Sequence, residues 1–146
     1  MFRNILVAVD GSATAGIALD AAAELAEALN SRLTIIAVAP EVPSFAYRSG
    51  IDVGALEHEA TNETEKLLRE SADGIPHDLP VTTVLKYGHP GERIVEQINH
   101  GNHDLLVMGS RGRGRVATSL FGSVGAYVHY HARVAMLVIH PEEGSS

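Results

Sequence analysis

A cluster of glycine, arginine and serine residues follows an apolar run in the last third of the chain. Residues 107–115 read Val-Met-Gly-Ser-Arg-Gly-Arg-Gly-Arg, and Gly122-Ser123-Val124 lies shortly beyond them. Glycines allow the backbone to approach a ligand closely and to turn its N–H groups toward an anion. Three of the eleven basic residues crowd into five positions here. The cluster indicates a phosphate site, with the N–H groups at the start of the next helix as further donors. The alternative is a solvated turn.

A second polar group, Asp10-Gly11-Ser12, follows the first apolar run of the chain. A carboxylate beside a polyphosphate is repelled unless a cation lies between them, so Asp10 suggests a Mg²⁺ ion bound directly or through water. Asp10 is also suited to accept hydrogen bonds from a ribose or a base. A third role is to cap the following helix, for which Ser12 is a further candidate. The residues alone leave these roles open.

Apolar runs and helical patterns alternate along the chain. Strands are predicted at Asn4–Val9, Arg32–Ala39, Val81–Lys86, Asp104–Met108 and Val134–Ile139, and helices at Ala13–Leu29, Asp52–Ala72, Pro90–Asn99 and Thr118–Ala132. Continuous apolar runs are typical of strands that are buried on both faces. The alternation predicts an α/β fold, an open five-stranded parallel sheet with helices on both faces. In the first helix, the predicted apolar face holds Ile17, Ala21, Leu25 and Ala28.

This architecture places the two polar clusters at one edge. Open α/β sheets bind ligands beyond the carboxyl ends of their strands, where the strand order reverses. With the order 2-1-3-4-5 or 3-2-1-4-5, the loops after the first and fourth strands flank that point. This position favours a ligand site over a simple turn. The chain lacks the Gly-x-x-x-x-Gly-Lys-Ser/Thr motif of P-loop proteins. The long connection Pro40–Ile51 is a candidate mobile flap.

Composition limits the remaining possibilities. The 146 residues are enough for a single domain, 1–146, with a frayed tail at 141–146. Eighteen acidic against eleven basic residues give a net charge of −7, which argues against nucleic-acid and anionic-membrane partners. There is no cysteine, so disulfides and thiolate chemistry are excluded. Neither an export signal nor a membrane span is recognisable, and a cytoplasmic location is expected.

The eight histidines raise the question of a metal site. Two pairs, His100 with His103 and His129 with His131, lack the i, i+4 spacing and the neighbouring carboxylates that a zinc site needs. Most of the histidines are therefore expected on the surface or at helix ends. His89 is singled out because it is expected to cap the turn at the ligand edge.

Together these motifs resemble the nucleotide-binding branch of the universal stress protein family. The resemblance rests on Gly109-x-x-Gly112 followed by nine residues and Gly122-Ser123, and it extends over nearly the whole chain. Further matching segments are residues 5–12, Gly88-x-Pro90, residues 104–112 and residues 136–139. The family usually has a proline just before the last strand, where this chain has Ala135, and the difference bears on how that strand pairs.

The resemblance implies a Rossmann-like fold that binds ATP, with a homodimer joined through the last strand. Carried over residue by residue, Asp10 and Val38 would hold the ribose and adenine. The phosphates would be lined by Gly109, Arg111, Gly112, Gly122, Ser123 and Val124. Asp10 would be the candidate contact for Mg²⁺.

No catalytic nucleophile with a fixed base is recognisable in the sequence. The expected function is therefore a nucleotide-responsive switch or binding protein in the stress response, with slow ATP hydrolysis at most. Two alternatives stay open at this point. One is a dimeric interaction module that binds no nucleotide, against which the intact glycine spacing argues. The other is an enzyme that acts on an adenylated small molecule.

Overall fold

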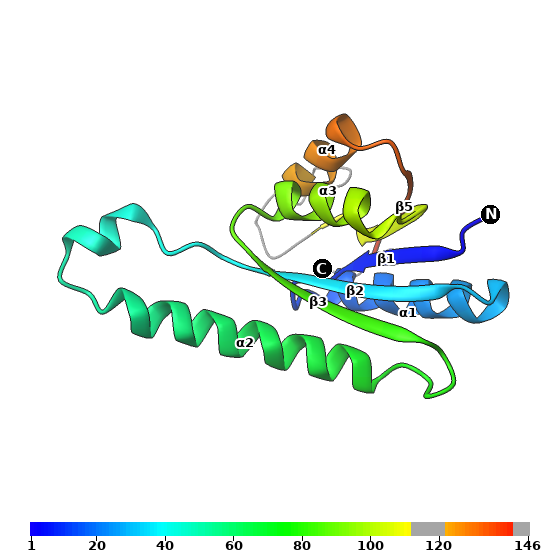
Figure 1. Ribbon diagram of the computed structural model, residues 1–146, viewed down its shortest axis with the longest axis horizontal. Coiled ribbons are helices and arrows are strands. Elements are labelled where there is room, and N and C mark those ends of the chain that lie inside the picture. The colour runs from blue at the N-terminus through cyan, green and yellow to red at the C-terminus, as the bar shows by residue number, and fades with distance from the viewer. Residues whose placement is uncertain (112–121, 142–146) are drawn as a thin grey trace.

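The fold was analysed in a computed structural model, which describes residues 1–111 and 122–141. Its core is a sheet of five parallel strands in the order β3-β2-β1-β4-β5. The strands are β1 (Asn4–Ala8), β2 (Arg32–Ala39), β3 (Val81–Tyr87), β4 (Leu105–Gly109) and β5 (Ala135–Ile139). The predicted α/β architecture and the second of the two proposed strand orders are confirmed (Figure 1).

Helices cover both faces of this sheet. The helices are α1 (Ala13–Leu29), α2 (Val53–Asp73), α3 (Pro90–Gly101) and α4 (Gly122–His131), and a short 3₁₀ helix, η1 (Ser44–Arg48), lies between β2 and α2. One apolar cluster joins α1 and α2 to one face through residues such as Ile5, Ala22 and Leu68. A second cluster joins α3 and α4 to the other face through Leu6 and Ile94. The two apolar clusters, one on each face of the sheet, therefore hold the strand ends in fixed positions.

The first helix packs through a different face from the one predicted. The side chains of Ala15, Ala18, Leu19, Ala22, Ala23 and Ala26 are buried, whereas Ile17 is 39% exposed and Ala28 is exposed. The buried stripe consists largely of alanines, whose short side chains allow the helix to lie close to the sheet. The prediction followed the larger apolar residues, of which Leu25 packs partly against the core. The predicted face was wrong by about a third of a turn.

The connection after β2 holds more structure than the predicted flap. It contains η1, and it leads into the 21-residue helix α2, of which only Thr64, Leu68 and Ser71 are buried. Figure 1 shows η1 and the first turns of α2 extending beyond the end of the sheet. The helix α2 therefore lies on the surface of the molecule. Across the described residues, no helix combines the length and the apolar character needed to span a bilayer.

Candidate functional site

The carboxyl ends of β1 and β4 meet at the centre of the sheet. Val7 is in register with Val107, so the loop that leaves β1 at Asp10 emerges beside the loop that leaves β4 at Gly109. These are the neighbouring strands between which the chain order reverses, since β2 continues the sheet on one side and β5 on the other. The predicted ligand edge therefore exists as an arrangement of the described backbone.

The Asp10 loop is closed by its own side chains. The backbone N–H of Ser12 donates to Asp10 Oδ1 at 2.9 Å, and the Ser12 hydroxyl accepts from the N–H of Ala15 at 3.2 Å. Ser12 is thus the N-cap of α1, and the capping role considered for Asp10 is wrong. Gly11 adopts φ +86° and has open space where a side chain would begin. Asp10 is left half-buried in a turn at the ligand edge.

Gly109 is required by packing as well as by any ligand. A Cβ atom at this position would lie 2.8 Å from Thr14 Cγ2, so only glycine lets the first turn of α1 come this close to β4. The next residue, Ser110, is buried, and its N–H donates to Ile139 O at 2.8 Å. Arg111 is partly exposed and is the last described residue before the gap. The backbone that enters the glycine loop is therefore held firmly between α1 and β5.

The start of α4 leaves room for a ligand among the residues that the structure describes. Gly122 has φ +65°, and a Cβ built there would meet no described atom within 4 Å. Ser123 is exposed, while Val124 packs against the apolar cluster under α3 and α4. Val38, near the carboxyl end of β2, packs against the same cluster. The strand beside β2 is β1, and the N–H of Val9, directly after β1, donates to Ile36 O. The Asp10 loop therefore leaves the sheet beside the carboxyl end of β2.

Seven of the eight predicted site residues belong to the described part of the chain. They lie on the carboxyl ends of β1, β2 and β4, in the loops that follow β1 and β4, and at the start of α4. Gly112 falls outside the described residues, as do Arg113, Arg115 and Ser119. Backbone N–H groups, an arginine, a serine hydroxyl and a carboxylate are chemically suited to a phosphorylated ligand.

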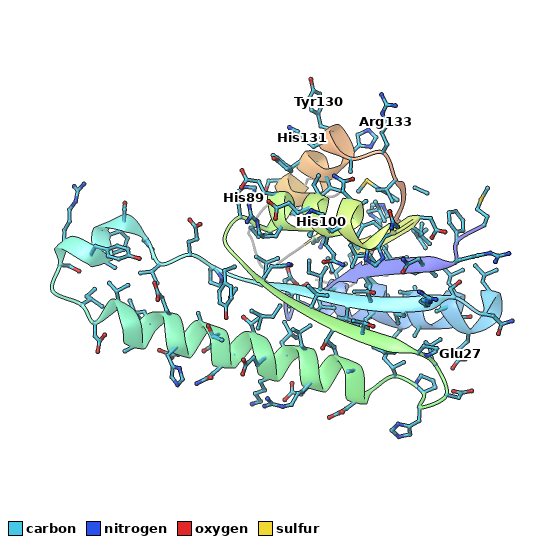
Figure 2. The ribbon with its side chains drawn as sticks, viewed as in Figure 1. Glu27, His89, His100, Tyr130, His131 and Arg133 are labelled. Carbon is cyan, nitrogen blue, oxygen red and sulfur yellow. The ribbon has the colours of Figure 1, made fainter. Side chains whose placement is uncertain are left out.

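A histidine and tyrosine cluster beside this edge was not predicted. His89 Nδ1 accepts the N–H of Glu92 at 3.4 Å and caps α3, as expected of it. Its ring lies 5.5 Å from that of Tyr127, which in turn stacks on His131 at 3.9 Å. Figure 2 shows His89 at the start of α3 and His131 on α4. Gly91 makes this packing possible, because a Cβ there would lie 2.7 Å from Tyr127 Cδ1. The helical spacing of Tyr127 in the sequence does not predict its contacts with the two histidines.

Most of the histidines are exposed, as expected, and His103 is the exception. His103 is 8% exposed and its Nε2 lies 3.1 Å from Gln97 Nε2. Burial lowers the pKa of His103, and the Asn4 backbone and the Asp104 carboxylate only partly oppose this shift. Among the residues that the structure describes, no three histidine, aspartate or glutamate side chains gather closely enough to hold a metal ion.

A shallow hollow lies elsewhere on the molecule. It is lined by Glu27, Arg32 and Asp78, among others, at the amino end of β2, and Figure 2 marks Glu27 there. None of the predicted site residues contributes to it. Because α/β sheets bind ligands at the opposite, carboxyl edge, the candidate site remains the one between β1 and β4.

Comparison with known proteins agrees with this geometry. The universal stress protein family model matches residues 1–140. A putative universal stress protein of Staphylococcus aureus (strain USA300) is 30% identical over 149 aligned positions, which cover 97% of this chain and 86% of that protein.

Two solved structures are similar over nearly their whole length. A universal stress protein family member from Burkholderia pseudomallei has a TM-score of 0.76 and 28% identity, covering 94% of this chain and 96% of that one. A universal stress protein solved in complex with cAMP has a TM-score of 0.69 and 28% identity, covering 94% and 97%. With its five-stranded parallel sheet and its family match over residues 1–140, this chain belongs to the universal stress protein family.

Proposed function

We propose that this protein binds ATP, with Mg²⁺, at the edge between β1 and β4 and acts as a nucleotide-responsive binding protein. The observation that carries the proposal is the pair of glycines at this edge. Gly11 and Gly122 both hold left-handed backbone conformations, and a Cβ at either position would meet no atom of the described residues within 4 Å. Such positions let backbone N–H groups approach a phosphate without side chains in the way. The cAMP complex of a similar protein supports an adenine nucleotide as the ligand class.

Each site residue has a role in this proposal. Asp10 and Val38 hold the ribose and adenine, Val38 through apolar contact and Asp10 through its carboxylate oxygens. The phosphates are held by Gly109, Arg111, Gly112, Gly122, Ser123 and Val124, chiefly through backbone N–H groups. Arg111 adds the positive charge that an otherwise acidic protein needs at a polyphosphate. A Mg²⁺ ion would neutralise phosphate charge and take most of its ligands from phosphate oxygens and water, with Asp10 as the protein's contribution.

Hydrolysis is expected to be slow. Asp10 is the one candidate for positioning a water, and its Oδ1 already accepts the Ser12 N–H. A turnover number well above about one per second, lost in Asp10→Ala, would contradict a binding role and favour the enzyme alternative.

Nucleotide binding is proposed to change the segment Pro40–Ile51. This segment begins two residues after Val38, so a ligand against β2 contacts the strand that carries it. A ligand shifts such a segment only if it binds the two states with different affinity. Hydrogen exchange with and without ATP tests the coupling, and unchanged protection over residues 40–51 would refute it.

The proposed function is tested by thermal and chemical unfolding with Mg²⁺ and ATP. A ligand that binds only the folded state adds about 2.7 kcal/mol of stability at 100 times its dissociation constant. ATP, ADP and AMP are compared, and GTP serves as the control for adenine recognition. Mass spectrometry of the denatured, purified protein identifies any nucleotide that copurifies. If no adenine nucleotide stabilises the protein, the ATP proposal is wrong and the alternative of a dimeric interaction module that binds no nucleotide is favoured.

The protein is also proposed to form a homodimer through β5. This strand ends the sheet, and Met136, Leu137, Val138 and Ile139 are all only half-buried. An apolar edge strand offers unpaired backbone groups to a second chain. Ala135 is exposed at the start of β5 and leaves a backbone N–H where the family's usual proline has none.

A further inference from the structure

An aromatic and acidic projection lies on the other side of the molecule from β5. We define the arm as residues 41–63, which run from the end of β2 through η1 into the first half of α2. Four apolar side chains of the arm are exposed, Phe45 at 67%, Tyr47 at 63%, Ile51 at 46% and Leu56 at 36%. Two of these residues are aromatic. Single exposed apolar side chains are common on protein surfaces, whereas several large ones gathered on one segment indicate an interaction surface.

The arm is ordered by its own interactions and not by burial against the sheet. The Asp52 side chain accepts the N–H of Ala55 and caps α2, and the Tyr47 hydroxyl lies 3.4 Å from Glu57 Oε1, linking η1 to α2. All the buried residues of α2 lie at Thr64 or beyond it. The first half of α2, residues 53–63, therefore extends past the sheet (Figure 1), although a helical segment this short is only marginally stable on its own.

The buried stripe of α2 continues into the arm as a face of mixed apolar and polar residues. Thr64, Leu68 and Ser71 face the sheet. Continued backward at helical spacing, the same stripe passes through Ala60 and Val53, which are only half-buried, with Leu56 beside it. Glu57 lies between them on the stripe and contacts Tyr47 of η1. From Val53 to Ala60 the stripe is about 10 Å long, the length of two helical turns. Val53, Leu56 and Ala60 thus give this face an apolar strip long enough to contact another helix, with Glu57 on the strip and Tyr47 of η1 beside it.

Charge selects the kind of partner. The arm holds Glu41, Asp52, Glu57, Glu59 and Glu63 but only one basic residue, Arg48. All five carboxylates are exposed. Within the described chain, ion pairs join Lys66 to Glu70 and Arg93 to Glu92 and Glu96, and none involves the arm. More than half of the protein's net charge of −7 is therefore concentrated here.

We propose that the arm is a docking surface for a basic amphipathic helix of a partner protein. Apolar residues of that helix would cover Phe45, Tyr47 and Leu56, and its lysines or arginines would face the arm's carboxylates. A second copy of this chain fits less well, because two arms would bring ten carboxylates together. The docking does not require a bound nucleotide. Because residues 40–51 are also proposed to respond to ATP, peptide binding is measured without nucleotide, and its outcome is then separate from the ATP proposal.

The proposal is tested with designed 18-residue peptides and fluorescence anisotropy. One peptide carries leucines on one helical face and lysines on the other. A second has glutamates in place of the lysines, and a third has the lysine peptide's composition in scrambled order. The lysine peptide is expected to bind the intact protein, and the other two at least about tenfold more weakly.

Two sets of variants locate the surface. The double variant Phe45→Ser, Tyr47→Ser is expected to weaken binding of the lysine peptide at least about tenfold. Leu56→Ser is expected to have the same effect, and it replaces the double variant if that variant folds poorly. Tyr130→Ser is the control, because Tyr130 is 85% exposed on α4, far from the arm in the fold.

Charge reversal provides the second test. The double variant Glu59→Lys, Glu63→Lys is expected to bind the glutamate peptide more tightly than the lysine peptide. The same reversal at Glu24 and Glu27, which are exposed on α1, should leave the preference unchanged. Equal binding of all three peptides, or arm variants that bind like the intact protein, would overturn the proposal. So would sedimentation showing that the serine variants turn a dimer into monomers, since the arm would then bind a second copy.

Discussion

Gly122 gives the most direct test of the phosphate site at the level of one residue. Gly122→Val places a side chain in the open space at the start of α4, where the proposal puts a phosphate. We expect ATP binding to be lost, as measured by calorimetric titration. Because φ is +65° at this position, the valine also strains the backbone by about 1–2 kcal/mol.

The strain is controlled with a second glycine of the same kind. Gly50 also has positive φ (+76°) and open space around its missing Cβ, but it lies in the arm. Gly50→Val should lose a similar amount of stability and still bind ATP, because the phosphate contacts stay intact even if the coupling to residues 40–51 changes the affinity. Unchanged ATP affinity in Gly122→Val would show that the phosphates are held elsewhere. Gly109 is unsuitable for this test, because a Cβ there collides with Thr14.

His103 makes the stability of the protein depend on pH. Gln97 Nε2 can only donate, so the neutral His103 ring accepts that hydrogen bond through Nε2. Burial lowers the pKa of His103 below its ordinary value of 6.5. The unfolded chain therefore binds more protons than the folded one as the pH falls through 6.5. We expect the free energy of unfolding to be largest above this pH and to decrease steadily below it.

Urea unfolding between pH 7.5 and 5.0 measures this effect. In His103→Gln the free energy of unfolding should decrease less below pH 6.5 than in the unaltered protein. This expectation does not depend on the stability of the variant at pH 7.5. His77→Gln, at an exposed histidine in the turn before β3, is the control and should keep the full decrease. Identical pH dependence in His103→Gln and the unaltered protein would contradict the assignment.

At the level of elements, α1 shows how closely the layers are packed. Ala22 is fully buried between α1 and the sheet. We expect Ala22→Leu to destabilise the fold by about 1–3 kcal/mol, because the added atoms have no space. Ala28→Leu, at an exposed position of the same helix, should change stability by less than about 0.5 kcal/mol. Urea unfolding measures both, and an equal cost would contradict the observed packing face.

The elements themselves were predictable because their signals are local. The bounds of α1 and β2 agree with the prediction to the residue, since Ser12 and the αL residue Asn30 limit the helix. The packing face of α1 was not predictable from apolar size, because helix and sheet approach closely only over alanines. The 3₁₀ helix η1 was also missed. Its five residues have no helical period long enough to recognise.

The candidate site was predictable to the extent that the topology dictates it. Strand order alone brings the Asp10 loop beside Gly109. The alternation of strands and helices left two orders open, and the observed one makes β1 and β4 neighbours. The close contact between Gly109 and Thr14, in contrast, depends on three-dimensional packing. The same is true of the contact between His89 and Tyr127, which come from different helices.

At the scale of the whole molecule, the open edge of β5 is the place where a second chain can add. The N–H of Ser110 donates to Ile139 O, so the backbone groups of Ile139 face β4. Neighbouring residues of a strand point their groups to opposite sides, and those of Val138 therefore face the open edge. On the other edge strand, Leu33 donates to Pro80 O, which leaves Thr83 of β3 facing outward by the same reasoning.

Proline substitutions at these two positions test the proposed dimer. Val138→Pro removes an N–H from the open edge without removing a bond to β4, and edge strands tolerate proline at such positions. Sedimentation should then give the 15.5 kDa monomer where the unaltered protein gives a species of twice that mass. Thr83→Pro makes the matched change on the opposite edge and should leave the dimer intact. If Val138→Pro still dimerises, or if Thr83→Pro is the variant that dissociates, β5 is not the interface. A dimer built on β3 would also bring a second subunit close to α2, the helix that covers β2 and β3, and thus close to the arm.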